Sequence, residues 1–176
     1  MCSRYGRTLA VNLSAHDLYD PLLVDRIEDL LSTWNVSSDL IQFELTENVL
    51  MEEPSIALET LIRLKKLGIQ LFVDDFGTGY SGLSYLQKLP VDSIKIDQSF
   101  VMPMMESVDS AVIVRSTIEL GHNLGLKVVA EGVDSKAVWD FLATMECDVA
   151  QGFFVSMPMP AEQFRNWENE WIRMSE

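Results

Sequence analysis

Two adjacent aspartates form the most informative chemical feature of the sequence. Asp74 and Asp75 end the apolar stretch 71–73 and lead directly into the glycine-rich segment 76–82, F-G-T-G-Y-S-G. Neighbouring side chains of a regular strand point to opposite faces, so both carboxylates reach one site only if the chain bends, which the downstream glycines permit. Two converging carboxylates are a natural site for a hard cation such as Mg²⁺ or Mn²⁺. The alternative is a solvated Asp-Asp turn beside a flexible loop.

A polar residue also stands at or near the C-terminal end of each of six short apolar stretches. These residues are Asn12, Glu44, Asp74, Lys95, Glu131 and Gln151. Strand alternation puts each polar side chain on the face opposite its immediate neighbours. If those neighbours pack against outer helices, the six polar groups face a shared interior, which is how a (β/α)₈ barrel builds an active site.

The apolar stretches alternate with longer amphipathic ones along the chain. The expected strands are 9–13, 41–45, 71–73, 93–96, 127–130 and 148–152, and the expected helices are 54–67, 111–124, 137–145 and about 161–172. This alternation is typical of parallel strands joined by right-handed crossovers, an α/β fold. An open doubly wound sheet is the competing architecture, but it would gather its polar groups at one switch point, and no GxGxxG segment follows the first strand.

Composition limits the classes of function. The 176 residues are 48% hydrophobic and read as one domain over 1–176, with 13 basic against 27 acidic side chains and a net charge of −14. Such a chain is a poor candidate for binding DNA, RNA or an anionic membrane, although a bound cation can reverse the local charge for a small phosphorylated ligand. Cys2 and Cys147 suggest neither a disulfide framework nor a zinc site. No signal peptide or membrane-spanning run is visible, so a cytoplasmic location is expected.

The donor set indicates the chemistry. Asn12, Glu44, Asp74 and Asp75 are all oxygen donors, which favours Mg²⁺, Mn²⁺ or Ca²⁺ over zinc held by thiolates. Asp75 could bridge two ions or bind a second one, as two-metal phosphodiester hydrolysis requires.

Two further side chains have a functional and a structural interpretation each. Lys95 could orient an attacking water or stabilise charge on phosphorus, or it could be a structural counter-ion for Glu44 or Asp74. Glu131 could accept a proton from a metal-bound water or complete a metal shell, or it could be a carboxylate at a helix entry.

Six motifs, taken in order and with their approximate spacing, resemble the EAL domain, a bacterial cyclic di-GMP phosphodiesterase. They are 11–14 (V-N-L-S), 43–47 (F-E-L-T-E), 74–81 (D-D-F-G-T-G-Y-S), 94–97 (I-K-I-D), 130–133 (A-E-G-V) and 151–153 (Q-G-F). The resemblance covers about 9–160, followed by the expected C-terminal helix. It implies a TIM-like barrel and hydrolysis of one phosphodiester bond of cyclic di-GMP, which gives the linear dinucleotide.

The resemblance also implies roles for particular residues. Asn12, Glu44, Asp74 and Asp75 would bind Mg²⁺ or Mn²⁺, with Ca²⁺ as an inhibitory ion. Lys95 and Glu131 would be catalytic, positioning or deprotonating the attacking water. Gln151, Asp97 and Pro160 would contact the substrate, while Glu47 and Thr46 would anchor the loop 76–80. The expected partners are cyclic di-GMP, a second copy of the chain, and sensory or diguanylate cyclase domains in a longer protein.

Several features depart from the family pattern. The Glu-Ala-Leu motif itself, whose glutamate is a metal ligand, is absent, as are the first two strands and an arginine of that region. This predicts a partial TIM-like (β/α) barrel with about six of eight βα units. Asp134 replaces a usual glutamate, Met157 a usual lysine and Gly82 a common serine.

The absent glutamate bears on activity. Because losing one carboxylate ligand typically costs ~10–100-fold or more, this chain alone is expected to be weakly active or inactive. The alternatives are a non-catalytic cyclic di-GMP binding, sensor or dimerisation module, and a fragment whose remaining strands come from another segment or protomer.

Overall fold

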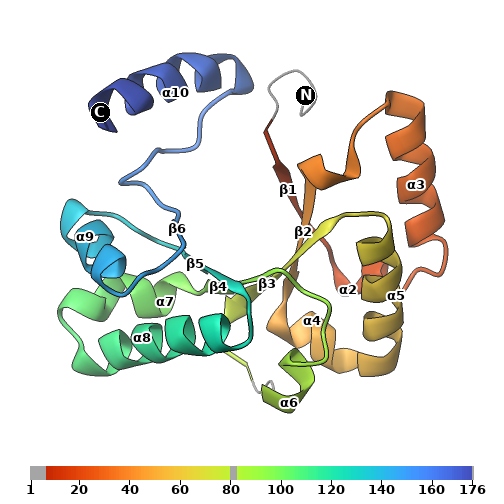
Figure 1. Ribbon diagram of the computed structural model, residues 1–176, viewed down its shortest axis with the longest axis horizontal. Coiled ribbons are helices and arrows are strands. Elements are labelled where there is room, and N and C mark those ends of the chain that lie inside the picture. Colours follow the sequence, from red (N-terminus) through yellow and green to blue (C-terminus); the bar gives the residue numbers. More distant parts are fainter. Residues whose placement is uncertain (1–6, 80–82, 176) are drawn as a thin grey trace.

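The computed structural model describes residues 7–79 and 83–175 and contains one six-stranded sheet (Figure 1). All neighbouring strands are parallel and follow the order of the sequence. The strands are β1 (Leu9–Asn12), β2 (Ile41–Thr46), β3 (Gln70–Phe76), β4 (Ser93–Ile96), β5 (Lys127–Ala130) and β6 (Val149–Ala150). The sheet curves into a half-barrel with helices between the strands, so the predicted partial barrel is confirmed.

Helices of very different length connect the strands. They are α2 (Ala15–Leu18), α3 (Leu23–Trp34), α4 (Glu47–Glu52), α5 (Pro54–Lys66), α6 (Leu83–Leu86), α7 (Gln98–Val101), α8 (Val108–Asn123), α9 (Lys136–Thr144) and α10 (Ala161–Ser175), with 3₁₀ turns η1 (Ser38–Leu40) and η2 (Met102–Met105). The sequence predicted α5, α8, α9 and α10. It did not predict α3, nor the single turns α2, α4, α6 and α7, which are too short to show a helical period.

Local signals explain where the long helices begin. Pro54 occupies the first turn of α5, where its missing N–H costs nothing. The hydroxyls of Ser107 and Ser135 accept hydrogen bonds from the backbone N–H groups of Ser110 and Val138, which caps α8 and α9. The predicted start of α8 at residue 111 was therefore three residues late, because the cap lies at Ser107.

The bend at the aspartate pair lies inside β3 rather than after it. The strand continues to Phe76, and its register with β4 shifts between Val73 and Phe76. Asp75 has φ +53°, a left-handed conformation that a short polar side chain tolerates. The predicted bend is thus confirmed, but the aspartate rather than a glycine adopts the unusual backbone angle.

The two sides of the sheet differ in chemistry. Leu45, Leu71, Val73, Ile94 and Ile96 are fully buried in the apolar core. The alternate residues of the strands surround a cavity of about 260 Å³ on the concave side. Its lining includes Gln42, Glu44, Phe72, Ser93, Lys95 and Lys127. The sheet therefore separates an apolar exterior, covered by helices, from a lumen of mixed lining that also includes Val129 and Val149 and holds the polar side chains.

The half-barrel is open between its two edge strands. All four residues of β1 are exposed, including the apolar Leu9 (45%) and Val11 (40%). An ion pair between Arg7 and Glu168 joins the segment before β1 to α10, which lies across this side of the molecule (Figure 1). None of the described helices has both the length and the apolar composition needed to span a bilayer.

Candidate metal centre and active site

At the C-terminal end of the sheet, a buried lysine joins carboxylates of β2, of β3 and of the segment after β5. The Nζ atom of Lys95 on β4 lies 2.8 Å from Oε2 of Glu44, 3.1 Å from Oδ1 of Asp74 and 2.7 Å from Oε1 of Glu131. The Lys95 side chain is only 3% exposed. Burial alone would lower the pKa of Lys95, but its hydrogen bonds to Glu131 and Glu44 and the nearby negative charges raise it above the usual value. Lys95 is therefore a cation shared by three acids.

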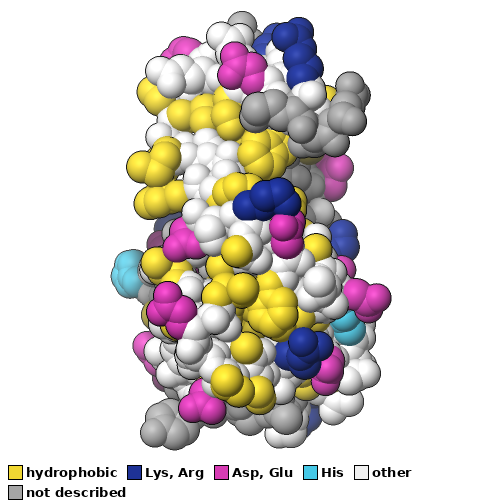
Figure 2. Space-filling model, turned by 90° about the vertical axis from the view of Figure 1, so that its left-hand side faces the viewer, with side chains coloured by type: hydrophobic (Ala, Val, Ile, Leu, Met, Phe, Trp, Pro, Cys, Tyr) yellow, Lys and Arg dark blue, Asp and Glu magenta, His cyan; other side chains and the backbone are white. Residues whose placement is uncertain are grey.

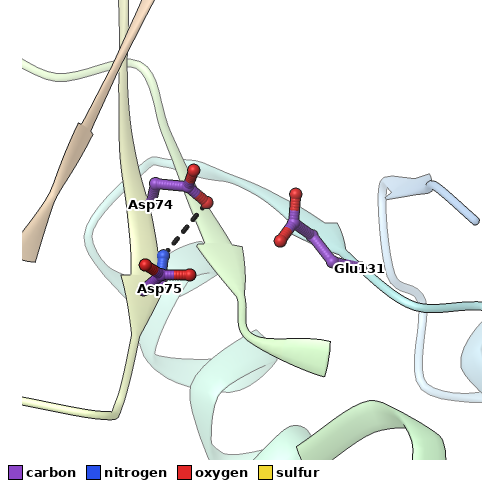
Figure 3. Close-up of side chains that lie close together, drawn as sticks. All are labelled: Asp74, Asp75 and Glu131. Carbon is purple, nitrogen blue, oxygen red and sulfur yellow. Dashed lines mark hydrogen bonds between the residues drawn. The ribbon is translucent and has the colours of Figure 1, made fainter. Parts of the chain in front are cut away.

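Three of the acidic side chains form a compact group. Asp74, Asp75 and Glu131 each offer an oxygen within 4.8 Å of the others. Figure 3 shows the two aspartates on β3 and Glu131 facing them from the segment after β5. The backbone N–H of Asp75 donates to Oδ1 of Asp74 at 3.0 Å, which fixes the pair relative to each other. The left-handed backbone at Asp75 thus brings two successive carboxylates to one place, which a regular strand cannot do.

The group carries more negative charge than its surroundings neutralise. Burial raises the pKa of Asp75, and the charges of Asp74 and Asp97 raise it further. Burial also raises the pKa of Glu131, and Lys95 offsets only part of this effect. One lysine thus serves an acidic cluster whose ionised form is disfavoured. A divalent cation would relieve this excess charge, and carboxylate oxygens suit Mg²⁺, Mn²⁺ or Ca²⁺.

Glu44 and Asn12 stand beside this group. Asn12 on β1 pairs with Glu44 on β2 in the sheet register, and it is exposed at the sheet edge. Glu44 is linked to Asp74 and Glu131 through Lys95. The structure therefore brings Asn12, Glu44, Asp74 and Asp75 to one end of the sheet, and it adds Glu131, named above as a catalytic residue, to the oxygen donors.

Glu47 holds the loop that follows the aspartates. Its buried carboxylate accepts a hydrogen bond from the backbone N–H of Gly77 at 3.1 Å. A Cβ atom at Gly79 would lie 2.9 Å from the same carboxyl group, so a larger residue there would displace the Glu47 side chain. Thr46 pairs with Asp74 in the register of β2 and β3. Residues 80–82 of the predicted loop and motif, Gly82 among them, lie outside the described residues.

The residues predicted to bind substrate have different surroundings. Gln151 lines a cavity of about 240 Å³ beside Glu131, together with Asp134 and Phe153. The carboxylate of Asp97 accepts from the backbone N–H of Ser99 at 3.0 Å and so caps α7. Pro160 directly precedes α10 and does not line the cavity.

Sequence reasoning missed several lining and contact residues. Gln98 and Met102 line the cavity beside Glu131, and Gln42 donates to Glu44. The two-residue alternation along β2 places Gln42 on the same face as Glu44, so this signal was available. Gln98 and Met102 lie in α7 and η2, which are too short for the sequence to show which of their side chains face the cavity.

The EAL domain family matches residues 3–158 of the chain. A sequence relative is the bifunctional diguanylate cyclase/cyclic di-GMP phosphodiesterase MucR of Pseudomonas aeruginosa, 40% identical over 155 residues, which are 88% of this chain and 23% of that protein. The structure of the MucR phosphodiesterase in complex with c-di-GMP superposes with a TM-score of 0.86 at 39% identity, covering 89% of this chain and 64% of that one.

Two more solved structures are similar. The EAL domain of Mycobacterium smegmatis DcpA has a TM-score of 0.87 at 32% identity, over 96% of this chain and 77% of that one. Klebsiella pneumoniae BlrP1, solved with manganese and cyclic di-GMP and with calcium and cyclic di-GMP, has a TM-score of 0.79 at 35% identity, over 86% of this chain and 39% of that one. The chain belongs to the EAL domain family. It spans between 20% and 27% of the length of the curated relatives it matches.

Proposed function

We propose that this chain carries the active site of a metal-dependent phosphodiesterase that hydrolyses cyclic di-GMP to the linear dinucleotide. The observation that supports this most is the cluster of Asp74, Asp75 and Glu131, whose charge Lys95 balances only in part. The related MucR and BlrP1 structures contain cyclic di-GMP, and one BlrP1 structure also contains manganese. A phosphodiester is an anion, so an acidic site binds it only if cations reverse the local charge.

Mg²⁺ or Mn²⁺ would be held by the oxygen donors at the C-terminal end of the sheet. The proposed ligands are Asn12, Glu44, Asp74 and Asp75, with the carboxylate of Glu131 beside them. A bound divalent ion supplies charge neutralisation at phosphorus and acidifies a water molecule. Ca²⁺, which accepts longer and more variable bonds, would occupy the site without supporting turnover.

The protein side chains have separate tasks in this proposal. Lys95 holds Glu44, Asp74 and Glu131 in place and keeps a fixed positive charge beside the scissile phosphate. Glu131 is close enough to the aspartates to accept a proton from the attacking water. Gln151 would contact the substrate in the adjoining cavity.

Glu47, Thr46, Asp97 and Pro160 complete the set of proposed site residues. Glu47 and Thr46 would keep the loop after β3 in the orientation that places Asp75. Asp97, whose charge helps to raise the pKa of the nearby Asp75, would contact the substrate. Pro160, which directly precedes α10, would also contact the substrate.

We propose that hydrolysis by this chain alone is slow. The lumen is open along β1, and Asn12 lies exposed at that edge. Water therefore reaches the metal ligands from the side, and ligands at an open edge are less firmly fixed than catalysis requires. This arrangement also favours a second candidate function, binding of cyclic di-GMP without turnover. Calorimetry with cyclic di-GMP in Ca²⁺ tests that alternative, which the absence of binding heat would exclude.

The decisive assay is hydrolysis of cyclic di-GMP with Mn²⁺, followed by separation of the linear product. We expect product that depends on Mn²⁺ and is lost in Asp75→Asn. Asp92→Asn is the matched control, because Asp92 lies at the opposite end of the sheet beside Lys65. No product above a metal-free control would contradict the proposed activity of this chain.

A second copy of the chain is the proposed partner at the face formed by η2 and α8. Val108 is 79% exposed, and Met105 and Val112 are also exposed beside an apolar groove of about 310 Å³. Figure 2 shows apolar side chains spread over the side of the molecule where α8, α9 and α10 lie. Glu106 and Arg115 line the same groove, so the face offers opposite charges to a copy of itself.

Light scattering tests this proposed dimer. We expect a dimer mass for the unmodified chain and a monomer for Val112→Asp, whereas a monomer in both cases would contradict it.

The curated relatives are much longer than this chain, which suggests that sensory or diguanylate cyclase domains accompany the site in the whole protein. The names of MucR and the oxygen sensor DosP indicate such domains for those proteins. Acting on a bacterial second messenger, the protein would work in the cytoplasm.

A further inference from the structure

Glu44 has a donor for each of its two carboxylate oxygens. Lys95 Nζ lies 2.8 Å from Oε2, and the side-chain amide of Gln42 donates to Oε1 from 3.0 Å. Gln42 stands two residues before Glu44 on β2, so both side chains face the lumen and line the same cavity. The Glu44 side chain is 11% exposed, so little water competes for these contacts.

Lys95 alone does not fix the orientation of Glu44. Its ammonium group is shared with Asp74 and Glu131, and three rotatable donors on a flexible stem do not define the plane of one carboxylate. A second donor to the other oxygen does define that plane. We infer that Gln42 is a positioning residue that sets the orientation of the Glu44 carboxylate for metal binding, an inference that rests on the proposed function of Glu44 as a ligand.

The chemistry of the amide suits this role. A carboxylate oxygen has two lone pairs, so the bond from Gln42 leaves Oε1 able to bind a cation as well. A lysine or arginine at position 42 would also hold Glu44, but it would add a positive charge that repels a divalent ion. A neutral donor orients the ligand and keeps the negative charge that the site offers to metal.

The backbone under Gln42 is well anchored. β2 lies between β1 and β3, and Gln42 pairs with Ala10 on one side and Gln70 on the other. The amide therefore starts from a fixed point. Gln70 provides a matched control, because it is the same residue type at the adjoining register position, and no hydrogen bond joins it to Glu44 among the residues that the structure describes.

The first test measures Mn²⁺ binding to the chain by electron paramagnetic resonance. Gln42→Met keeps the length of the side chain and removes the donor. We expect Gln42→Met to weaken Mn²⁺ binding by about 10–100-fold, the usual effect of losing a group that orients a ligand. We expect Gln70→Met to bind like the unmodified chain. Equal affinity in the two variants would overturn the inference.

The second test needs no metal and separates this inference from the proposed function. In ¹H–¹⁵N spectra of the metal-free chain, the side-chain NH₂ signals of Gln42 should shift on Glu44→Met, while those of Gln70 should not. An unchanged Gln42 signal would overturn the inference whatever the metal result. If the unmodified chain binds no Mn²⁺, the proposed metal function fails, and the Gln42 signal alone decides whether this amide orients Glu44. The same spectra show that each variant is folded.

Discussion

Carboxylates occupy both ends of the sheet, but they differ in how many basic side chains they contact. At the N-terminal ends of the strands, Asp92 and Asp148 each contact a basic side chain of their own, Lys65 and His122 respectively. At the C-terminal ends, within residues 7–79 and 83–175, three carboxylates share a single lysine, Lys95. Carboxylates that each have a basic partner of their own fasten elements of the fold together, whereas we expect carboxylates that share one partner to remain available to a ligand.

The N-terminal end contains the same arrangement twice. Asp92 precedes β4 and accepts the backbone N–H of Leu71, the second residue of β3, at 2.8 Å. Asp148 precedes β6 and accepts the N–H of Val128, the second residue of β5, also at 2.8 Å. Each basic partner comes from the last turn of the helix before the bonded strand, α5 or α8. Each aspartate therefore fastens a helix end and two strands together.

The C-terminal end shows the opposite effect on titration. Burial would raise the pKa of Asp148, but the Val128 N–H and the neighbouring His122 outweigh it and lower that pKa. The pKa values of Asp75 and Glu131 are raised instead. The same side-chain chemistry is thus stabilised in its ionised form at one end and disfavoured in that form at the other.

Removing the shared lysine should have the largest effect. Lys95→Met leaves three partly buried carboxylates without their cation, so we expect the free energy of unfolding of the metal-free chain to fall by about 3–5 kcal/mol. Urea denaturation measures this loss. A fall of less than about 1 kcal/mol would mean that other groups compensate these carboxylates and that Lys95 is not their main partner.

Metal binding at the C-terminal end of the sheet should stabilise the folded chain. At a free Mn²⁺ concentration of 100 times the dissociation constant, binding should raise the free energy of unfolding by about 2.7 kcal/mol. Asp74→Asn should abolish this gain and Asp92→Asn should retain it, because Asp92 already has its own cation. Thermal unfolding with and without Mn²⁺ gives the answer. A gain that survives Asp74→Asn would place the ion elsewhere.

Substitution of Asp92 and of Asp148, at the N-terminal ends of the strands, should lower the free energy of unfolding by modestly different amounts. Asp92→Asn loses a charge-assisted bond to Lys65 between two interior strands, at a cost of about 2 kcal/mol. Asp148→Asn should cost about 1 kcal/mol, because Asp148 anchors β6, which is only a two-residue edge strand. Urea denaturation of both variants at neutral pH compares them. The reverse order would show that the edge strand contributes more to stability than its length suggests.

Acidification should give the smallest and most diagnostic effect. The lowered pKa of Asp148 contributes stability above its unfolded value of about 4, which is lost as the pH falls through the folded value. The raised pKa of Asp75 works in the other direction, since its contribution is full below about 4 and is lost as the pH rises through the folded value.

The free energy of unfolding of the metal-free chain, measured between pH 6 and pH 3, distinguishes the effects of the two ends of the sheet. Asp75→Asn should remove a gain in stability on acidification, and Asp148→Asn should remove a loss. Identical pH profiles for the two variants would show that the two ends of the sheet respond alike to acid, contrary to the opposite pKa shifts of Asp75 and Asp148.

Much of the fold could be predicted because its signals are local. Alternation along each strand identified the polar lumen residues, and Pro54 marked the start of α5. The left-handed angle at Asp75 could not be predicted, because it depends on the register between β3 and β4. The sequence favoured a bend but could not place it.

The site was harder to predict because its contacts are long-range. Lys95 and Glu44 are 51 residues apart in sequence, and the pairing of β2, β3 and β4 in the sheet brings them together. The grouping of Glu131 with the aspartates follows from the positions of β3 and β5 on either side of β4. The pairs at the N-terminal end, Lys65–Asp92 among them, gave no sequence signal at all.

Anomalous scattering from crystals grown with Mn²⁺ and cyclic di-GMP tests the central claim most directly. We expect a manganese peak among the oxygens of Asp74, Asp75 and Glu131, with a phosphate of the dinucleotide beside it. Manganese at the N-terminal end near Asp92, or cyclic di-GMP bound away from a metal-free acidic cluster, would contradict it.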